Sequence, residues 1–268
     1  MQTGERAKRV ILFDELRGVM ILSMLAYHIC YDLAQVVGLP GMEWFYSKGA
    51  DLWQLSICGT FILVAGACCA YSRSNLKRGL RLFLLGMLFT AVTALAVPDL
   101  LIVFGLLHFL GVAVLLAVPL KRLFERIPPV WGMVGSLLLF WLCYHVQSGW
   151  IGFSSGWSIR LPEFLYSTNW LFVLGFHNAS FFSSDYFPLL PYLFLFWAGM
   201  FLARFSLPPF CYRSHSRPLA FFGAAQHLDL CAAPAGGVWA AVANLPILKA
   251  DCCGAKKHQP NCSVSLAE

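Results

Sequence analysis

The sequence predicts an all-α membrane protein, a polytopic helical bundle of about six transmembrane helices with a cytoplasmic N-terminus. Three observations lead to this prediction. Of the 268 residues, 59% are hydrophobic and only 12% are charged, which is about half the charge of a typical soluble domain. The apolar residues fall in runs close to the ~20 residues that a helix needs to cross the hydrocarbon core. Short basic clusters separate these runs.

Six apolar runs are expected to form the spans. We place them at 10–38, 50–72, 80–97, 100–120, 130–147 and 187–205, the third being short for a span. Helices are expected because each backbone N–H and C=O in lipid must be paired internally. Period-two alternation, the sign of a barrel, is missing. The first run is too long and too charged for a cleavable signal, and no A-x-A site follows it.

Basic residues set the orientation, because cytoplasmic loops are enriched in Lys and Arg. They gather before the first run, between the second and third, between the fourth and fifth, and after the sixth. The members are Arg6, Lys8 and Arg9; Arg73, Lys77, Arg78 and Arg81; Lys121, Arg122 and Arg126; and Arg204, Arg213 and Arg217. This pattern predicts a multi-pass protein of the cell inner (plasma) membrane. It also accounts for the net charge of +6 without a nucleic-acid partner.

The first span carries ionisable residues, which are costly at membrane depth unless paired or wet. At about 100° per residue, Asp14, Arg17, His28 and Asp32 share one helix face about 60° wide, which should face the bundle interior. Asp14 and Arg17 are three apart and can pair. His28 and Asp32 are four apart, a geometry that suits an activated base or nucleophile. The alternative is a structural polar cluster that holds helices together.

Further candidates lie elsewhere. His108, in the fourth span, would form a hydrogen bond between helices or contact a substrate. His177 and Asp185 flank the start of the sixth span, at the end of the external loop 148–186. This loop is either solvated or a lid over an acceptor, and its stretch 171–176 is expected at the membrane interface. The cysteines show no C-x-x-C spacing and are expected as small buried residues, and no metal site is predicted.

Four phrases occur in order: FDELRGVMILSMLAYHICYDL, GTFILVAGACCAYSR, IVFGLLHFLGVAVLL and SSDYFPLLPYLFLFWAGMFLAR. Together they resemble the bacterial branch of the heparan-alpha-glucosaminide N-acetyltransferase catalytic-domain family, over roughly residues 8–222. The opening D-x-x-R-G also resembles the acyltransferase-3 membrane family. The first resemblance implies acyl transfer across the membrane, from cytoplasmic acetyl-CoA (acyl-CoA) as cosubstrate to an amino sugar or other glycan. No bound cofactor is expected.

The resemblance implies a role for one histidine, and the chemistry of the implied reaction suggests roles for other residues. His28 is the closest match to the family's histidine, and Asp32 would support it. Arg73, Lys77, Arg78 and Arg81 would hold the CoA phosphates, although the positive-inside rule alone accounts for them. Asp14, Arg17, His108, His177 and Asp185 complete the expected substrate-binding set. The partners would be the lipid bilayer, the acyl-CoA and the acceptor.

Two other functions and one further property stay open. In a transporter or flippase the polar strip would line a path, and such proteins predict inverted repeats, which the sequence does not show. In a non-catalytic membrane partner, His28→Ala would have no biochemical effect. The sequence also leaves open whether copies of the chain form a homo-oligomer.

The C-terminus departs from the family pattern. Relatives continue with a last span that carries a pattern like Arg-x-Ser-x-x-Ile-Tyr-x-x-His-Gln-Pro, whereas this chain reads GAAQHLDLCAAPAGGV. With a suitable choice of codons, a shift of one base yields A-R-H-S-T-W-I-Y-A-L-H-Q-P-V. We therefore expect a transmembrane acyltransferase-like domain at 1–222 and an out-of-frame, poorly ordered tail at 223–268. The zinc-like group Cys252, Cys253, His258 and Cys262 would then have no meaning, and the chain would lack its last helix and be inactive or unstable.

Overall fold

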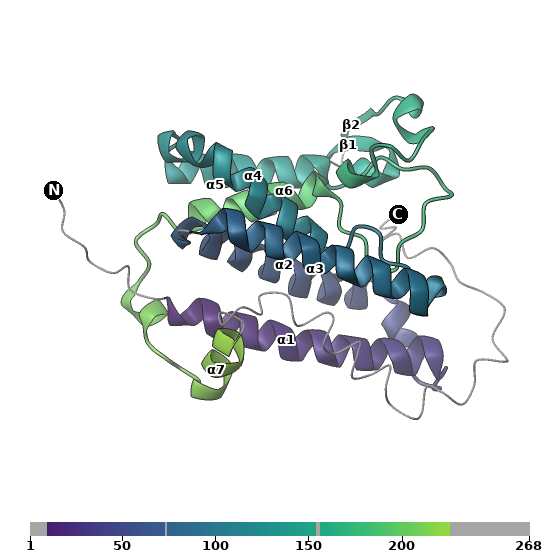
Figure 1. Cartoon of the computed structure of the whole chain (residues 1–268), viewed down its shortest axis with the longest axis horizontal. Coiled ribbons are helices and arrows are strands. Elements are labelled where there is room, and N and C mark those ends of the chain that lie inside the picture. The colour runs from purple at the N-terminus through teal and green to yellow at the C-terminus, as the bar shows by residue number, and fades with distance from the viewer. Residues whose placement is uncertain (1–9, 73, 154–155, 226–268) are drawn as a thin grey trace.

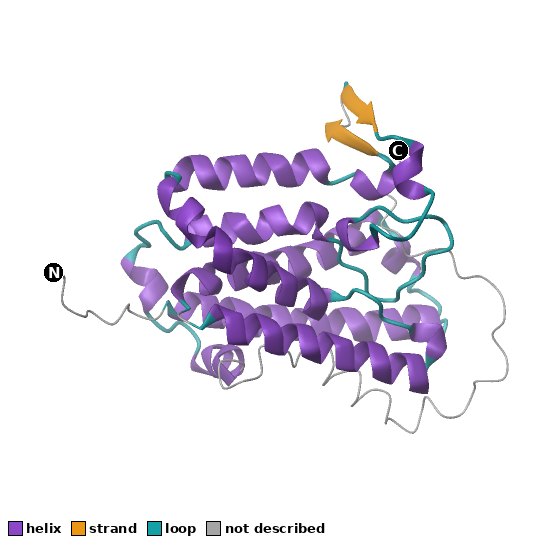
Figure 2. Cartoon of the chain, turned by 45° about the horizontal axis from the view of Figure 1, so that its top comes forward, coloured by secondary structure: helices purple, strands orange, loops and turns teal. Residues whose placement is uncertain are grey.

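The computed structural model describes residues 10–72, 74–153 and 156–225 as a bundle of helices with a small hairpin at one end (Figure 1). The long helices are α1 (Ile11–Tyr31), α2 (Lys48–Tyr71), α3 (Asn75–Ala96), α4 (Leu106–Arg126), α5 (Pro129–Cys143) and α6 (Leu189–Leu202). A short helix, α7 (Arg217–Ala225), packs beside α1. The strands β1 (Trp150–Phe153) and β2 (Trp157–Arg160) form an antiparallel pair near the outer end of α5 (Figure 2).

The all-α membrane class is confirmed. Within the described ranges, four helical segments are long and apolar enough to cross a membrane: α2, α3, α4 and the stretch Pro129–Ser148 that contains α5. The other two expected spans are helical but fall outside this set. Helix α6 has only 14 residues, and α1 carries Asp14, Glu15 and Arg17 within its first two turns.

Two expected boundaries were wrong. The third span is not short, because α3 starts at Asn75 and takes the basic residues into its first turns. The fourth does not start near 100 but at Leu106. The residues before it form a 3-10 turn, Pro98–Leu100, and then an irregular stretch with a bend at 103–104. Its Leu101 and Phe104 carbonyls accept backbone hydrogen bonds of 2.9 Å from Ser184 and Phe187.

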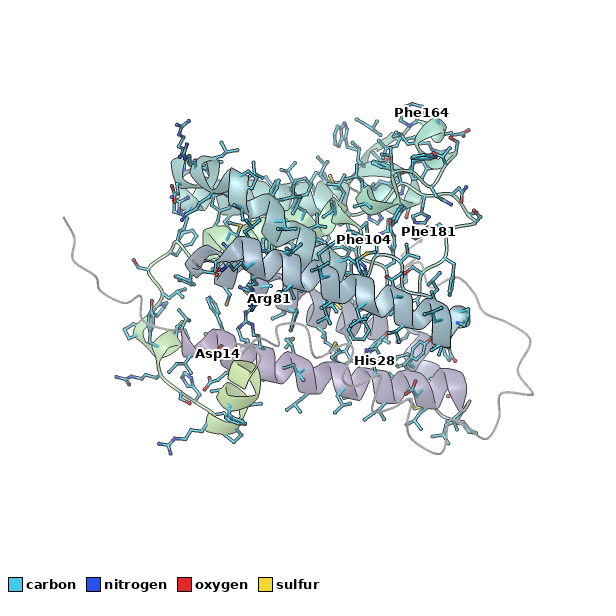
Figure 3. The ribbon with its side chains drawn as sticks, in the orientation of Figure 1. Asp14, His28, Arg81, Phe104, Phe164 and Phe181 are labelled. Carbon is cyan, nitrogen blue, oxygen red and sulfur yellow. The ribbon has the colours of Figure 1, made fainter. Side chains whose placement is uncertain are left out.

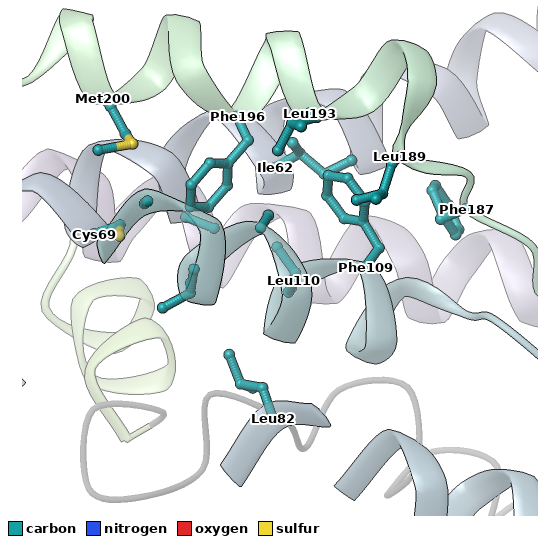
Figure 4. Packing of buried hydrophobic residues seen from close by; sticks show 14 of the residues in the cluster. Ile62, Cys69, Leu82, Phe109, Leu110, Phe187, Leu189, Leu193, Phe196 and Met200 are labelled. Carbon is teal, nitrogen blue, oxygen red and sulfur yellow. The ribbon is translucent and has the colours of Figure 1, made fainter. Parts of the chain in front are cut away.

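The main core lies between α2, α4 and α6 (Figure 4). Phe109 of α4 and Phe196 of α6 are fully buried there, together with Ile62 of α2. Helices α2 and α6 approach at Gly66 and Gly199. A Cβ on Gly66 would overlap the carbonyl of Phe196, and one on Gly199 would overlap the carbonyl of Leu63. Small residues that let backbones approach closely are typical of packed membrane helices.

Arg204 joins two of the basic regions at one end of the bundle. Its guanidinium donates hydrogen bonds to the backbone carbonyls of Phe124, Glu125 and Ile127, at the end of α4. The C-terminal end of α6 therefore lies against the α4–α5 connection. Two of the predicted cytoplasmic connections are thus on the same side.

Candidate functional site

The first part of the site is an ion pair near the N-terminal end of α1. Asp14 Oδ1 lies 3.7 Å from Arg17 Nη1, and both side chains are about 4–5% exposed. The pairing and the inward orientation expected for these two residues are both found. A helix places residues three apart on one face, so the sequence spacing was enough to predict this contact.

Arg17 lines a small pocket between four helices. The other lining residues are Phe61 and Ala65 of α2, Arg78 and Leu82 of α3, and Leu110 and Val114 of α4. Within the described residues, the buried Nε of Arg78 has no hydrogen-bond partner. Two guanidinium groups thus reach one pocket that is otherwise apolar. Buried N–H groups are usually paired, so the Nε–H of Arg78 marks this pocket as a candidate site for a group that accepts a hydrogen bond.

The basic stretch that starts α3 divides into two kinds of position. Arg78 faces the pocket, whereas Lys77 and Arg81 are exposed. In Figure 3, Arg81 extends from α3 toward α1. Arg73 lies outside the described residues. Of the three expected phosphate-binding residues that the structure describes, Arg78 is therefore the one that lines the pocket beside Arg17.

The second part of the site lies near the other end of α1, where His28 is found (Figure 3). His28 and Asp32 are both half-buried and interact electrostatically across one turn. Asp32 is the first residue of a π-helical turn, Asp32–Val36, that continues α1. Single π turns are frequent at functional sites. The strip is therefore buried at its N-terminal end and only half-buried at its C-terminal end.

Aromatic and polar side chains surround this end of α1 on the α2 side. Trp53 donates a hydrogen bond of 2.8 Å to Ser23, and Tyr27 donates one of 3.3 Å to Gln54. Phe45 contacts the ring of Tyr27 at a centroid distance of 5.0 Å. These contacts fix the C-terminal half of α1 against α2 and the segment before it.

His108 acts as a link between α3 and α4 in this structure. Its Nε2 lies 3.3 Å from the hydroxyl oxygen of Thr90, and that hydroxyl donates to the carbonyl of Ile102 at 2.6 Å. The Thr90 proton is thus already used, so His108 Nε2 must be the N–H donor and Nδ1 the bare acceptor. The side chain is only 2% exposed, and its ring packs on Gly86. This is the inter-helix hydrogen bond that the sequence offered as one alternative.

Asp185 and His177 occupy the outer loop before α6. Asp185 Oδ2 accepts a hydrogen bond of 3.1 Å from the backbone N–H of Leu106, the first residue of α4. Burial raises the pKa of the Asp185 carboxyl above its ordinary value, and this hydrogen bond opposes the shift. The His177 ring contacts those of Phe181 and Tyr186, at centroid distances of 5.0 and 5.4 Å, and these two rings also contact each other. Neither residue meets the Arg17 pocket.

The described parts of the loop 148–186 fold onto the end of the bundle at which α5 ends. Phe172, Val173 and Leu174 form a 3-10 turn that packs against the main core. Tyr186 donates a hydrogen bond to the carbonyl of Phe172, and Tyr166 donates one to the carbonyl of Val146. These contacts fix part of the loop to the bundle, whereas Phe164 and Trp170 of the same loop are 71% and 86% exposed.

One buried ionisable residue was missed. Glu15 is 5% exposed and faces α7, away from the pocket. Its Oε1 accepts hydrogen bonds from the backbone N–H groups of His215 and Ser216, at 2.6 and 2.8 Å. A carboxylate at this position also complements the positive end of α7. Its place among the ionisable residues of a predicted span was a signal that could have identified it.

Cysteines and metal ligands show no organised site in the part of the chain that the structure describes. Cys30, Cys58, Cys68, Cys69, Cys143 and Cys211 are free thiols, and no three His, Cys, Asp or Glu side chains gather there as metal ligands. The zinc-like group at 252–262 lies outside the described residues.

Comparison with known proteins gives one match. A family model described as "Heparan-alpha-glucosaminide N-acetyltransferase, catalytic" matches residues 9–231. No curated protein and no solved structure matches the chain. The matched range contains every described helix and both strands.

Proposed function

Because the chain belongs to the heparan-alpha-glucosaminide N-acetyltransferase catalytic-domain family, we propose that it is a membrane acyltransferase that uses cytoplasmic acyl-CoA. It would move an acetyl group to an amino sugar or other glycan on the far side of a bacterial inner membrane. The observation that carries this proposal is the family match over 9–231. The four apolar helices support a multi-pass membrane protein.

The donor would bind at the Arg17 end of α1. A CoA thioester carries phosphates and cannot enter lipid, so it needs cationic partners at the membrane surface. Arg17 and Arg78 line one pocket, and Arg78 Nε has no partner among the described residues. Lys77 and Arg81 lie on the first turns of the same helix, α3. This arrangement supports a phosphate-binding role for Arg78 and Arg17 in particular, with Asp14 holding Arg17 in place.

The transfer would take place toward the other end of α1. His28 and Arg17 are eleven residues apart, which corresponds to about 16 Å along a helix. An extended arm of the donor would bridge this separation and bring the thioester near His28. The external loop, with His177 and Asp185, would face the acceptor. His108 would support this region by holding α4 to α3.

His28 would act as the general base. It takes the proton from the acceptor amine or hydroxyl, the acceptor atom forms a bond to the acetyl carbonyl carbon, and the carbon–sulfur bond breaks. The CoA thiolate leaves and is protonated. Asp32 would stabilise the imidazolium. In a second route, His28 Nε2 or Nδ1 forms a bond to the acetyl carbonyl carbon and the carbon–sulfur bond breaks, releasing the CoA thiolate. The acceptor then displaces the imidazole from the acetyl group, and the acceptor proton passes to the released ring.

Membranes that contain the protein, incubated with acetyl-CoA labelled in the acetyl group, test this proposal. We expect a labelled product, whose identification gives the acceptor. The printed chain is compared with a version whose reading frame is restored from residue 223, because we also propose that 223–268 is an out-of-frame tail. Resequencing the gene and mass spectrometry of the tail test that second point. If both versions bind CoA and neither transfers label, the acyltransferase proposal is wrong.

A further inference from the structure

The hairpin after α5 has one apolar face. Trp157 and Ile159 lie two residues apart on β2, so they share a face, while Ser158 and Arg160 lie on the opposite face. The ladder pairs Phe153 with Trp157 and Ile151 with Ile159. Directly paired residues of an antiparallel ladder share a face. The first face is therefore apolar throughout, whereas the second combines Trp150 and Gly152 with Ser158 and Arg160.

The second face, which carries Trp150, Gly152, Ser158 and Arg160, is the one that contacts the rest of the bundle. Trp150, paired with Arg160, stacks on His145 at a centroid distance of 3.9 Å and an interplanar angle of 12°. This contact fixes the hairpin to the end of α5. Within the part of the chain that the structure describes, the apolar face has no comparable cover: Phe153, Trp157 and Ile159 are 45%, 55% and 48% exposed. A hairpin of only two strands is marginally stable in water, so an exposed apolar face of this kind needs a partner.

The position of the hairpin indicates that partner. The membrane-crossing stretch ends at Ser148, and β1 starts two residues later. Two residues span at most about 7 Å, so the hairpin lies at the depth where lipid headgroups meet the hydrocarbon core. The strands project sideways from the end of α5, across the long axis of the bundle (Figure 2). They therefore extend over the lipid beside α5 and not away from the membrane.

The distribution of charge fits the same partner. No Asp, Glu, Lys or Arg occurs from Pro129 to Ile159, and the first charged residue is Arg160, on the opposite face of the hairpin. Phe164 follows in the next turn, is 71% exposed, and lies at the same end of the bundle (Figure 3). Exposed aromatic side chains are typical of the membrane–water interface.

We propose that the hairpin Trp150–Arg160 is an interfacial anchor whose face of Ile151, Phe153, Trp157 and Ile159 lies on the lipids of the outer leaflet beside α5. Arg160, on the other face, then points to water and lipid phosphates. The anchor holds the start of the external loop at a fixed height over the bilayer. This proposal depends on the membrane-spanning helices and is independent of the acyltransferase activity.

Fluorescence of the full chain in phosphatidylcholine vesicles tests this proposal. The contribution of Trp157 is the difference in emission between the chain and Trp157→Phe, and that of Trp150 is measured with Trp150→Phe. We expect vesicles of lipid brominated near the headgroup to quench most of the Trp157 contribution, and aqueous iodide to leave it nearly unchanged. Trp150, held on His145, should show a smaller difference between brominated and ordinary lipid.

A photo-crosslinking side chain gives a second measurement that leaves all tryptophans in place. Incorporated at position 159 it should label lipid, and at the neighbouring position 158 it should label lipid several-fold less. Trp157 that is quenched by iodide and insensitive to bromine would show a face in water and overturn the proposal. Insensitivity to both quenchers, with crosslinks from position 159 to protein or glycan, would show a different partner and overturn it as well.

Discussion

The carboxylate of Asp185 and the backbone N–H of Leu106 are joined by a hydrogen bond of 3.1 Å, so a side chain from the loop before α6 satisfies the first turn of α4. Helix starts leave such N–H groups without a partner in the helix itself. In Asp185→Ala the backbone N–H of Leu106 loses its acceptor, which should cost about 1–2 kcal/mol of stability. The apparent melting temperature in detergent should fall, whereas Asp185→Asn, which keeps an acceptor oxygen, should remain close to the wild type.

The same residue predicts a pH dependence. Burial raises the pKa of Asp185 in the folded protein, so the folded state binds this proton more tightly than the unfolded state does. Its contribution to stability is therefore greatest below the ordinary pKa of aspartate, about 4, and is lost as the pH rises through the raised value. Melting temperatures measured from below pH 4 to above the raised pKa of Asp185 should fall with rising pH in the wild type. This fall should be absent in Asp185→Asn. An equal fall in melting temperature in both proteins would show that other titratable groups cause it.

Gly86 and Gly135 provide a matched pair of glycine substitutions. A Cβ on Gly86 would lie 2.8 Å from His108 Nδ1, whereas one on Gly135 has nothing within 4 Å. Gly86→Ala should push α3 from the His108 ring and cost about 1–3 kcal/mol. Gly135→Ala, inside α5, should be neutral or stabilise by about 0.5–1 kcal/mol. Thermal unfolding of both variants measures this, and an equal effect at the two sites would contradict the contact with His108.

Glu15 should control the attachment of α7 to α1. Glu15→Ala leaves the N–H groups of His215 and Ser216 without their acceptor, at a cost of about 1–3 kcal/mol each where water cannot replace it. We expect faster cleavage by trypsin at Arg213, whereas the bond after Arg217 is resistant because Pro218 follows it. Glu43→Ala is the control, because Glu43 is exposed and its carboxylate accepts a hydrogen bond from the N–H of Gly41, only two residues away. Unchanged cleavage in Glu15→Ala would mean that other contacts hold α7.

Arg78 and Lys77 are adjacent in the chain, and comparing them tests whether CoA binds in the pocket or at the surface. Arg78 lines the pocket beside Arg17, and Lys77 is exposed on the same turn. Charge-assisted hydrogen bonds contribute about 1.5–3 kcal/mol, so Arg78→Gln should weaken CoA binding by about 10- to 100-fold. Lys77→Gln should change it by no more than about twofold, as expected of an exposed, screened charge. Direct binding of CoA to the purified protein measures both, and equal losses would place the phosphates on the surface.

His28 and Asp32 should affect transfer more than donor binding. A general base contributes about 10²- to 10⁴-fold to rate, so His28→Ala should lower acetyl transfer by at least about 100-fold while CoA binding persists. Asp32→Asn keeps the size of the side chain but removes the charge that interacts with His28, and should give a smaller loss. Rates from labelled acetyl-CoA and parallel binding measurements separate the two effects. Full activity in His28→Ala would remove His28 from the mechanism.

Local periodicity was sufficient to predict the helices and the Asp14–Arg17 pair. Helical spacing relates residues only a few positions apart, and both features are of this kind. The start of α4 was misplaced because the apolar run continues through 101–104, where backbone hydrogen bonds to 184–187 replace helical ones. Pro98 and Gly105 were the signals that marked this interruption.

Contacts between distant parts of the chain were not predictable in the same way. Glu15 meets residues of the 214–216 segment, and Asp185 meets Leu106. Hydropathy gives the length of each helix but not which helix lies beside it or at what height. The hairpin was missed for another reason, since a pair of four-residue strands is too short to stand out from a loop rich in Gly, Ser and Trp.

Gly66 and Gly199 face each other's helix backbone, each against a carbonyl of the opposite helix. Both positions already hold the smallest residue, so neither can shrink to make room for a larger neighbour. A substitution at one therefore has no second-site rescue at the other, unlike most core exchanges, where a loss of volume on one side offsets a gain on the other. Random mutagenesis with selection for folded protein should leave these two positions unchanged while the surrounding leucines and phenylalanines vary.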